Sequence, residues 1–284
     1  MNTFFRRAVT IFLSIFITLY LVEYENSTAR NEVSTVTFLD VGQGDSIFIE
    51  SPSGKQLLVD AGRGSDASEI PSEIMPLFDS SIDLVIGTHP DADHIGGMSD
   101  VLDIFEIGGF VEPGSTSTSK VYQSLEQSIS QKKIPHMHAR ENMVVDFGDG
   151  AYFVVLFPGM DVSDWETNNS SVVGVYIYKN TSFLLTGDAP IATEMYLSKK
   201  YKSQLKTDVL KLGHHGSRTS SGETFLTTTN PGLAIISAGK NNSYGHPHTE
   251  VMDRLKKLEI PYFSTIDMGS ITLETNGETI GLRR

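Results

Sequence analysis

Four side chains that can bind metal ions stand close together in GTHPDADHIGG, residues 87–97. They are His89, Asp91, Asp93 and His94, and they follow directly on an apolar run. Because like charges repel, two neighbouring aspartates require either the water around a surface turn or a bound cation. Imidazole and carboxylate ligands together suit zinc, manganese or iron. This stretch alone leaves both interpretations open.

More acidic and imidazole side chains end or follow other apolar runs. They are Asp60 after LLV, Asp188 after LLTG, His214 and His215 after VLKLG, and His246 and His248 after AIISAG. Each cluster therefore stands at the C-terminal end of a predicted strand, where a rigid sheet positions catalytic groups and the loops stay open to substrate. A chance surface turn explains one such cluster but not four, so the sequence predicts a metal centre.

The elements that must position these residues are short strands with helices between them. The runs typical of strands are VTFLDV, DSIFIES, KQLLVDAG, IDLVIGTH, AYFVVLF, SVVGVYIY, SFLLTGD, DVLKLGHHG and GLAIISAG, a short strand near residues 109–112, and a terminal hairpin of SITLET and ETIGL. Helices are predicted near residues 68–78, 97–105, 119–132, 191–205 and 249–258, and another starts near 221. Two β-rich halves of this kind predict two sheets packed face to face and covered by helices.

The bulk composition excludes several classes of function. The 284 residues include no cysteine, which excludes disulfides, thiolate ligands and cysteine nucleophiles. A net charge of −13 argues against a broad basic surface for nucleic acid, so an anionic substrate needs a local feature such as metal ions.

The N-terminal residues 1–34 are predicted to be a targeting segment and linker, and residues 35–284 one hydrolase domain. Arg6 and Arg7 precede the uncharged apolar run 8–22, and Glu23 follows it, which predicts that the rest of the chain lies outside the membrane. The run is shorter than the ~20 residues that span a bilayer comfortably. A membrane anchor facing outside and a cleaved signal peptide of a secreted protein both remain open.

The motifs FLDVGQGDS, VDAG, HPDADHIGG, LLTGD, LKLGHHGSRTSS and YGHPH resemble those of the metallo-β-lactamase superfamily. They are most similar to the extracellular hydrolase module of the competence protein ComEC and its stand-alone relatives. The resemblance covers about residues 35–281 and implies an α/β (α+β) fold, a four-layer αββα sandwich, with two divalent metal ions, zinc or manganese.

Two departures from the wider superfamily concern the ligands. Asp91 stands where most members have a second histidine, and NNSS, residues 168–171, replaces a third one. Both departures resemble the ComEC subgroup and make the site more anionic. A carboxylate in place of an imidazole favours hard ions, so manganese competes better with zinc here than in an all-histidine site.

Carried over residue by residue, the resemblance implies two sets of ligands joined by one carboxylate. The sets are His89 and Asp91 on one ion and Asp93, His94 and His246 on the other, with Asp188 bridging them. Within the pair after VLKLG, His215 is favoured as the ligand that replaces the lost third histidine, and His214 as an outer or catalytic group. Asp60 fits an orienting role, and Asn168 an outer position.

Several of the remaining polar residues also have an ordinary structural explanation. Asp93, His214 and His248 are the candidates for catalytic roles, although His248 could equally be a helix-capping neighbour. Gln43 and Asp45 are predicted to approach the site from a hairpin turn. The segment 217–219 could grip a phosphate or could be an ordinary loop. The alternation of histidines in HMH, residues 136–138, is typical of a surface strand.

The sequence therefore predicts a metal-dependent hydrolase of phosphodiesters, in particular an extracytoplasmic DNA nuclease related to competence and DNA uptake. Its expected partners are DNA or another phosphodiester and, through the N-terminal segment, the membrane. One alternative is another metallohydrolase on the same scaffold, such as a phosphocholine esterase or a lactonase. A second is a non-catalytic subunit of a DNA-uptake machine.

Overall fold

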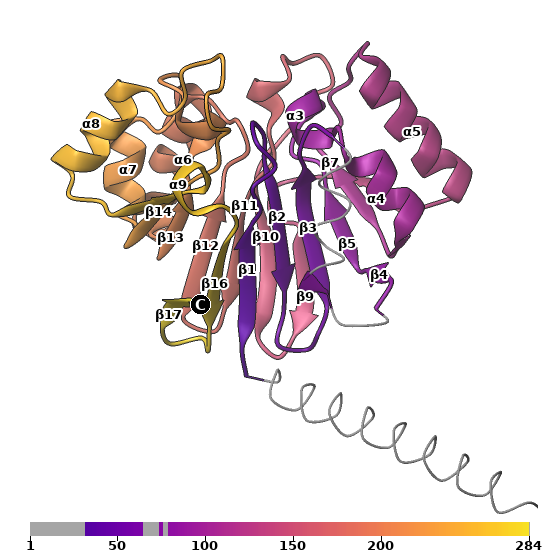
Figure 1. Cartoon of the computed structure of the whole chain (residues 1–284), viewed down its shortest axis with the longest axis horizontal. Helices are drawn as coiled ribbons and strands as arrows, with labels where there is room; N and C mark the ends of the chain where they lie inside the picture. Colours follow the sequence, from indigo (N-terminus) through magenta and orange to yellow (C-terminus); the bar gives the residue numbers. More distant parts are fainter. Residues whose placement is uncertain (1–31, 65–73, 76–78, 284) are drawn as a thin grey trace, which may run out of the picture.

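The computed structural model describes residues 32–64, 74–75 and 79–283, which form a mixed α/β fold (Figure 1). The apolar run 8–22 and most of the helix predicted near 68–78 lie outside these residues. No helix within the described part is long and apolar enough to cross a membrane.

The described residues form two large sheets. The first has the strand order β17 (Ile280–Leu282), β16 (Ile271–Thr275), β1 (Ser34–Phe38), β2 (Ser46–Glu50), β3 (Gln56–Ala61), β5 (Leu84–Ile86), β7 (Phe110–Glu112) and β8 (His136–His138). The second has the order β15 (Tyr262–Ser264), β14 (Leu233–Ile236), β13 (Val209–Lys211), β12 (Thr181–Leu185), β11 (Val173–Tyr178), β10 (Ala151–Phe157) and β9 (Val144–Gly148). In each sheet an antiparallel part continues into a parallel part, from β3 to β8 and from β12 to β15.

The alternation of side chains along the strands creates separate core layers. In β2, Ile47 and Ile49 belong to the apolar core between the sheets, whereas Phe48 belongs to the core under the helices of the first sheet. Successive strand residues point to opposite faces, so a strand buried at every position must be covered on both sides.

Helices cover the outer face of each sheet. They are α3 (Ala92–Ile95), α4 (Met98–Ile104) and α5 (Lys120–Lys132) beside the first sheet, and α6 (Ile191–Tyr201), α7 (Glu223–Thr229) and α8 (Thr249–Lys257) beside the second (Figure 1). A short helix α9 (Thr265–Met268) follows β15. The predicted helices at 97–105, 119–132, 191–205 and 249–258 are confirmed, each within a few residues.

The structure divides or shortens two of the predicted strands, and it contains β9 and β15, which were not predicted. IDLVIGTH is divided at Asp83: β4 (Ser81–Ile82) pairs with β6 (Glu106–Ile107) in a separate small sheet, and β5 continues in the large one. The Asp83 carboxylate accepts the backbone N–H of Gln56 at 2.8 Å, which fixes the chain at the division. DVLKLGHHG ends as a strand at Lys211, because His214 and His215 both take left-handed backbone angles, with φ of 52° and 55°.

Candidate metal centre

Side chains from the ends of both sheets converge on one buried centre. Asp60 lies in β3, His89 follows β5, Asp188 follows β12 and His215 follows β13. All four are buried. In α/β sheets, ligands bind outside the carboxyl ends of the parallel strands, and these residues stand at those ends.

The loop between β5 and α3 is held in place by the hairpin between β1 and β2. Asp91 is the N-cap residue of α3, and its carbonyl accepts the N–H of His94 at 3.0 Å. The N–H of Asp45 donates to the carbonyl of Asp93 at 3.2 Å. A Cβ at Gly44 would lie 2.3 Å from that carbonyl oxygen, so this close approach requires glycine. The predicted approach of the hairpin turn to the site is confirmed.

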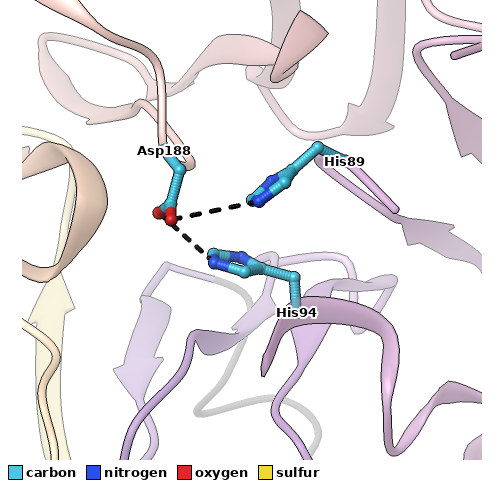
Figure 2. A group of neighbouring side chains, drawn as sticks. All are labelled: His89, His94 and Asp188. Carbon is cyan, nitrogen blue, oxygen red and sulfur yellow. Dashed lines mark ion pairs between the residues drawn. The ribbon is translucent and has the colours of Figure 1, made fainter. Parts of the chain in front are cut away.

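His89, His94 and Asp188 form the innermost group (Figure 2). Asp188 Oδ1 lies 3.3 Å from His94 Nε2, and Asp188 Oδ2 lies 3.9 Å from His89 Nε2. Both Nε2 atoms and Asp188 Oδ1 are buried without a hydrogen-bond partner in the described part of the chain. Buried polar atoms are almost always satisfied, so three unsatisfied ligand atoms that face one another fit a bound cation.

The Nδ1 atoms of His94 and His215 have their own hydrogen-bond partners, which leaves the lone pair of each Nε2 free for a metal ion. His94 Nδ1 lies 2.7 Å from Asp60 Oδ2, and the N–H and hydroxyl of Thr88 donate to the same carboxylate. His215 Nδ1 lies 3.0 Å from the carbonyl of Ser237. An imidazole that donates from Nδ1 presents the lone pair of Nε2, which is the usual arrangement of a metal-binding histidine.

A second group shares His94 with the first. It consists of Asp93, His94 and His215, whose ligand atoms lie within 4.8 Å of one another. His215 Nε2 is 3.5 Å from Asp93 Oδ2 and 3.7 Å from Asp188 Oδ2. The Asp188 carboxylate therefore faces both groups.

The two adjacent histidines face the same oxygen of Asp188, Oδ2. His215 lies beside Asp93 and His94, whereas the sequence analysis placed it where a third histidine is missing. His214 Nε2 is 3.5 Å from Asp188 Oδ2, the oxygen that also faces His89. Left-handed backbone is uncommon outside glycine and costs ~1–3 kcal/mol per residue, so its occurrence at both positions marks a constrained site.

Four predicted residues lie around these groups rather than in them. Asp91 is half-exposed, with Oδ2 3.7 Å from His89 Nε2. The His246 ring centroid is 5.5 Å from that of His214, and Gln43 Nε2 lies 3.4 Å from His246 Nδ1.

The other two are His248 and Asn168. His248 is the N-cap of α8, and its Nδ1 accepts the N–H of Arg218 at 3.1 Å. Asn168 begins the short 3-10 helix η1 (Asn168–Ser170), and its Oδ1 is buried with no hydrogen-bond partner among the described residues.

The buried carboxylates of the centre favour bound protons or cations. Burial raises the pKa of Asp188, but the charges of His94 and His215 outweigh burial and bring that pKa well below its usual value. Burial lowers the pKa of His215, yet Asp188 and Asp45 outweigh it and raise that pKa to about 9. Carboxylates that retain protons on buried imidazoles form a pocket where divalent cations compete with those protons.

The sequence analysis missed Lys211. This fully buried ammonium group pairs with the buried carboxylate of Asp45, whose Oδ1 is 3.2 Å from His215 Nδ1. A single lysine within the apolar run VLKLG was the available indication, because a buried charge requires a partner.

Comparison with known proteins identifies the family. The model of the metallo-beta-lactamase superfamily matches residues 39–240. The chain belongs to this superfamily. It is 30% identical over 253 residues to ComE operon protein 3 of Bacillus subtilis and 32% identical over 242 residues to Recombination protein 2 of Haemophilus influenzae. Competence protein ComA of Neisseria gonorrhoeae is 28% identical over 254 residues.

These relatives are much longer than the chain. The alignments with the Bacillus and Haemophilus proteins each cover 83% of this chain but only 32% and 28% of those proteins, and the Neisseria alignment covers 88% and 33%. The chain thus spans about a third of the length of the curated relatives it matches. It is a metallo-β-lactamase superfamily member with ComEC-like, competence-related relatives.

Solved structures share the fold. CmlA, a diiron β-hydroxylase from Streptomyces venezuelae, has a TM-score of 0.58 at 14% identity, covering 85% of this chain and 54% of that one. Igni18, a metallo hydrolase from Ignicoccus hospitalis, has a TM-score of 0.55 at 14% identity, covering 84% and 98%. At these identities the metallo-β-lactamase fold is what the proteins have in common.

Proposed function

We propose that the chain is a metal-dependent phosphodiesterase that cleaves DNA outside the membrane. The observation that carries the proposal is the pair of overlapping ligand groups, which share His94 and face one carboxylate, that of Asp188. His94 Nε2 has one lone pair and can bind only one ion, but with Asp91 and His214 nearby the two groups offer enough ligands for two divalent ions, zinc or manganese. Pairs of ions are widely used to cleave phosphate esters.

The donor atoms support a division of the ligands between two ions. His89 and Asp91, with His214, would hold one ion; Asp93, His94 and His215, which lies beside Asp93, would hold the other. Bound there, divalent ions supply Lewis acidity toward a phosphoryl group and make water acidic enough to act as a nucleophile. Asp60 keeps the His94 ring oriented, and Asp188 serves both sets.

Two histidines beside the centre are placed to hydrogen-bond a substrate or to transfer a proton. Gln43 Nε2 donates to His246 Nδ1, because Gln43 Oε1 already accepts the N–H of Gly239. A neutral His246 then carries its proton on Nε2, from which it can donate a hydrogen bond to an oxygen of a bound diester. The His248 ring lies 4.8 Å from the His246 ring, so His248 is a candidate proton donor. Asp93 and His214 are the other two residues predicted to be catalytic.

The substrate class follows from charge and from the relatives. A chain of net charge −13 needs local cations to hold an anionic diester, and the metal centre supplies them. The curated relatives are named for competence and recombination, which involve DNA. With the basic-before-acidic flanks of the apolar run 8–22, this favours a DNA substrate met outside the membrane.

The test is cleavage by the purified chain with zinc, manganese and magnesium supplied separately. The substrates are single-stranded DNA, double-stranded DNA and a chromogenic phosphodiester. We expect DNA cleavage that is lost in Asp188→Asn and retained in Asp253→Asn, an exposed aspartate on α8 used as matched control. Cleavage of the chromogenic diester without DNA would favour another metallohydrolase. A metal-loaded but inert protein would favour the non-catalytic uptake subunit.

A further inference from the structure

A second cluster of metal-binding side chains lies at the edge of the first sheet. β8 is the outermost strand of that sheet and carries His136 and His138 two positions apart, so both rings lie on the same face. Glu112, at the end of β7, pairs in register with His138. Glu112 is buried, with 5% of its surface exposed, although it carries a charge.

Both imidazoles face a single oxygen of this glutamate. Glu112 Oε1 lies 3.3 Å from His136 Nε2 and 3.7 Å from His138 Nε2. The two ring centroids are 5.9 Å apart, and the three ligand atoms lie within 4.8 Å of one another. Two imidazoles and a carboxylate suit the borderline divalent ions zinc, nickel and copper.

Helix α5 supplies the surroundings expected for ligands. The Tyr122 hydroxyl lies near the Glu112 carboxylate. Burial and the charge of that carboxylate raise the pKa of the hydroxyl, and outer partners of ligating carboxylates are placed in this way. Glu126 Oε1 is buried and has no hydrogen-bond partner among the residues described. Burial and the charge of Glu112 raise the pKa of Glu126, so a cation here would relieve the repulsion between the two carboxylates.

We propose that Glu112, His136 and His138 form a separate site for one divalent transition-metal ion. The site shares no residue with the metal centre described above. Like the main centre, it lies toward the C-terminal ends of the parallel strands β5, β7 and β8. Strand β8 is two strand spacings, about 10 Å, from β5. Its ion fastens the three-residue edge strand β8 to β7.

The test is a metal titration of the full chain in the Asp188→Asn background, in which the main centre is expected to be empty. Zinc and cobalt are added separately, bound equivalents are measured after dialysis, and the visible absorption of cobalt reports the ligands. We expect one equivalent that is lost in His136→Gln/His138→Gln. Met137→Gln is the matched control, because this exposed residue lies between the histidines and points to the other face of β8.

Two further measurements distinguish a metal site from simple ion pairs. Added zinc should raise the melting temperature of the parent but not that of the double histidine variant, since binding stabilises only the folded state that holds the site. Tyr122→Phe should keep the equivalent but weaken zinc binding by ~10–100-fold, the usual effect of losing an outer partner. Equal bound equivalents and equal cobalt spectra with and without the two histidines would overturn the proposal, whatever the outcome of the nuclease assay.

Discussion

Asp45 and Lys211 form a buried ion pair between the two sheets. Asp45 precedes β2 in the first sheet, and Lys211 ends β13 in the second. Burial raises the pKa of Asp45, but the charges of Lys211 and His215 together outweigh it and bring that pKa to about 2. The pair thus joins the sheets next to His215, and it keeps the Asp45 carboxylate charged where His215 Nδ1 contacts it.

Breaking this pair should destabilise the protein strongly. Lys211→Met leaves a buried carboxylate unpaired, so we expect the free energy of unfolding to fall by about 3–5 kcal/mol. Urea unfolding measures the change, with Lys240→Met at an exposed position as control. Asp45→Asn/Lys211→Met removes both charges and should recover part of the loss. Asp45→Asn alone completes the cycle, and if the effects of Asp45→Asn and Lys211→Met simply add in the double variant, the two residues are not coupled.

The carboxylates of Asp188 and Asp60 should differ in their effect on metal content. Asp188 faces both ligand groups, whereas Asp60 reaches them through the Nδ1 of His94, the ring nitrogen that faces away from the groups. Asp188→Asn should empty the centre, and Asp60→Asn should weaken binding by ~10–100-fold. Metal analysis of the purified variants over a range of free zinc decides the matter. A centre emptied by Asp60→Asn but filled in Asp188→Asn would reverse the two roles.

Glu194 should make stability depend on pH. This buried residue of α6 accepts the backbone N–H groups of Ser221 and Gly222, and it thereby holds the segment that follows His215. Burial raises the pKa of Glu194 to about 7, although the two N–H groups act against the shift. The folded chain therefore retains a proton that the unfolded chain loses near pH 4.5.

Stability should consequently fall as the pH rises from about 4.5 to about 7, by about 3 kcal/mol in total, and then level off. Glu194→Gln should remove this slope, although it loses one acceptor at every pH. Denaturant unfolding across pH 4–8 measures it, with the exposed Glu274→Gln as control. An unchanged slope in Glu194→Gln would mean that another group is responsible.

Much of the centre could be predicted because its residues follow apolar runs. His89 and Asp188 each stand just beyond a buried strand, and His94 lies in the short helix α3 that follows β5. Strand ends can be recognised from hydrophobicity and turn residues. The hairpin that carries Asp45 was predictable from the glycines in GQGD.

The rest depended on pairings that no local pattern contains. Two left-handed residues in succession bring His215 rather than His214 beside Asp93 and His94, and sequence alone does not reveal backbone angles. The edge cluster requires the parallel pairing of β7 with β8, which brings Glu112 beside His138. The strand β9 is largely exposed, so it lacks the apolar run by which most other strands were predicted, and the three-residue strand β15 was missed as well.

Asp91 is the residue of the opening motif whose role most needs a test. It caps α3 and lies 3.7 Å from His89 Nε2, with 39% of its side chain exposed. We expect it to bind the same ion as His89. Asp91→His replaces a hard anionic ligand by a neutral imidazole, so the affinity for zinc relative to manganese should rise.

A neutral ligand leaves more positive charge at the centre, so water bound there should lose its proton at lower pH. If that ionisation sets the lower limb of the activity–pH profile, the limb should also move to lower pH. Titrations of activity with each metal, in wild type and variant, over a range of pH measure both effects. Asp100→His, at an exposed position on α4, is the matched control and should change neither. If Asp91→His likewise shifts neither the metal preference nor the pH limb, Asp91 does not bind metal. Its carboxylate is then held by water at the start of α3, and His89 shares its ion with Asp188 and His214 alone.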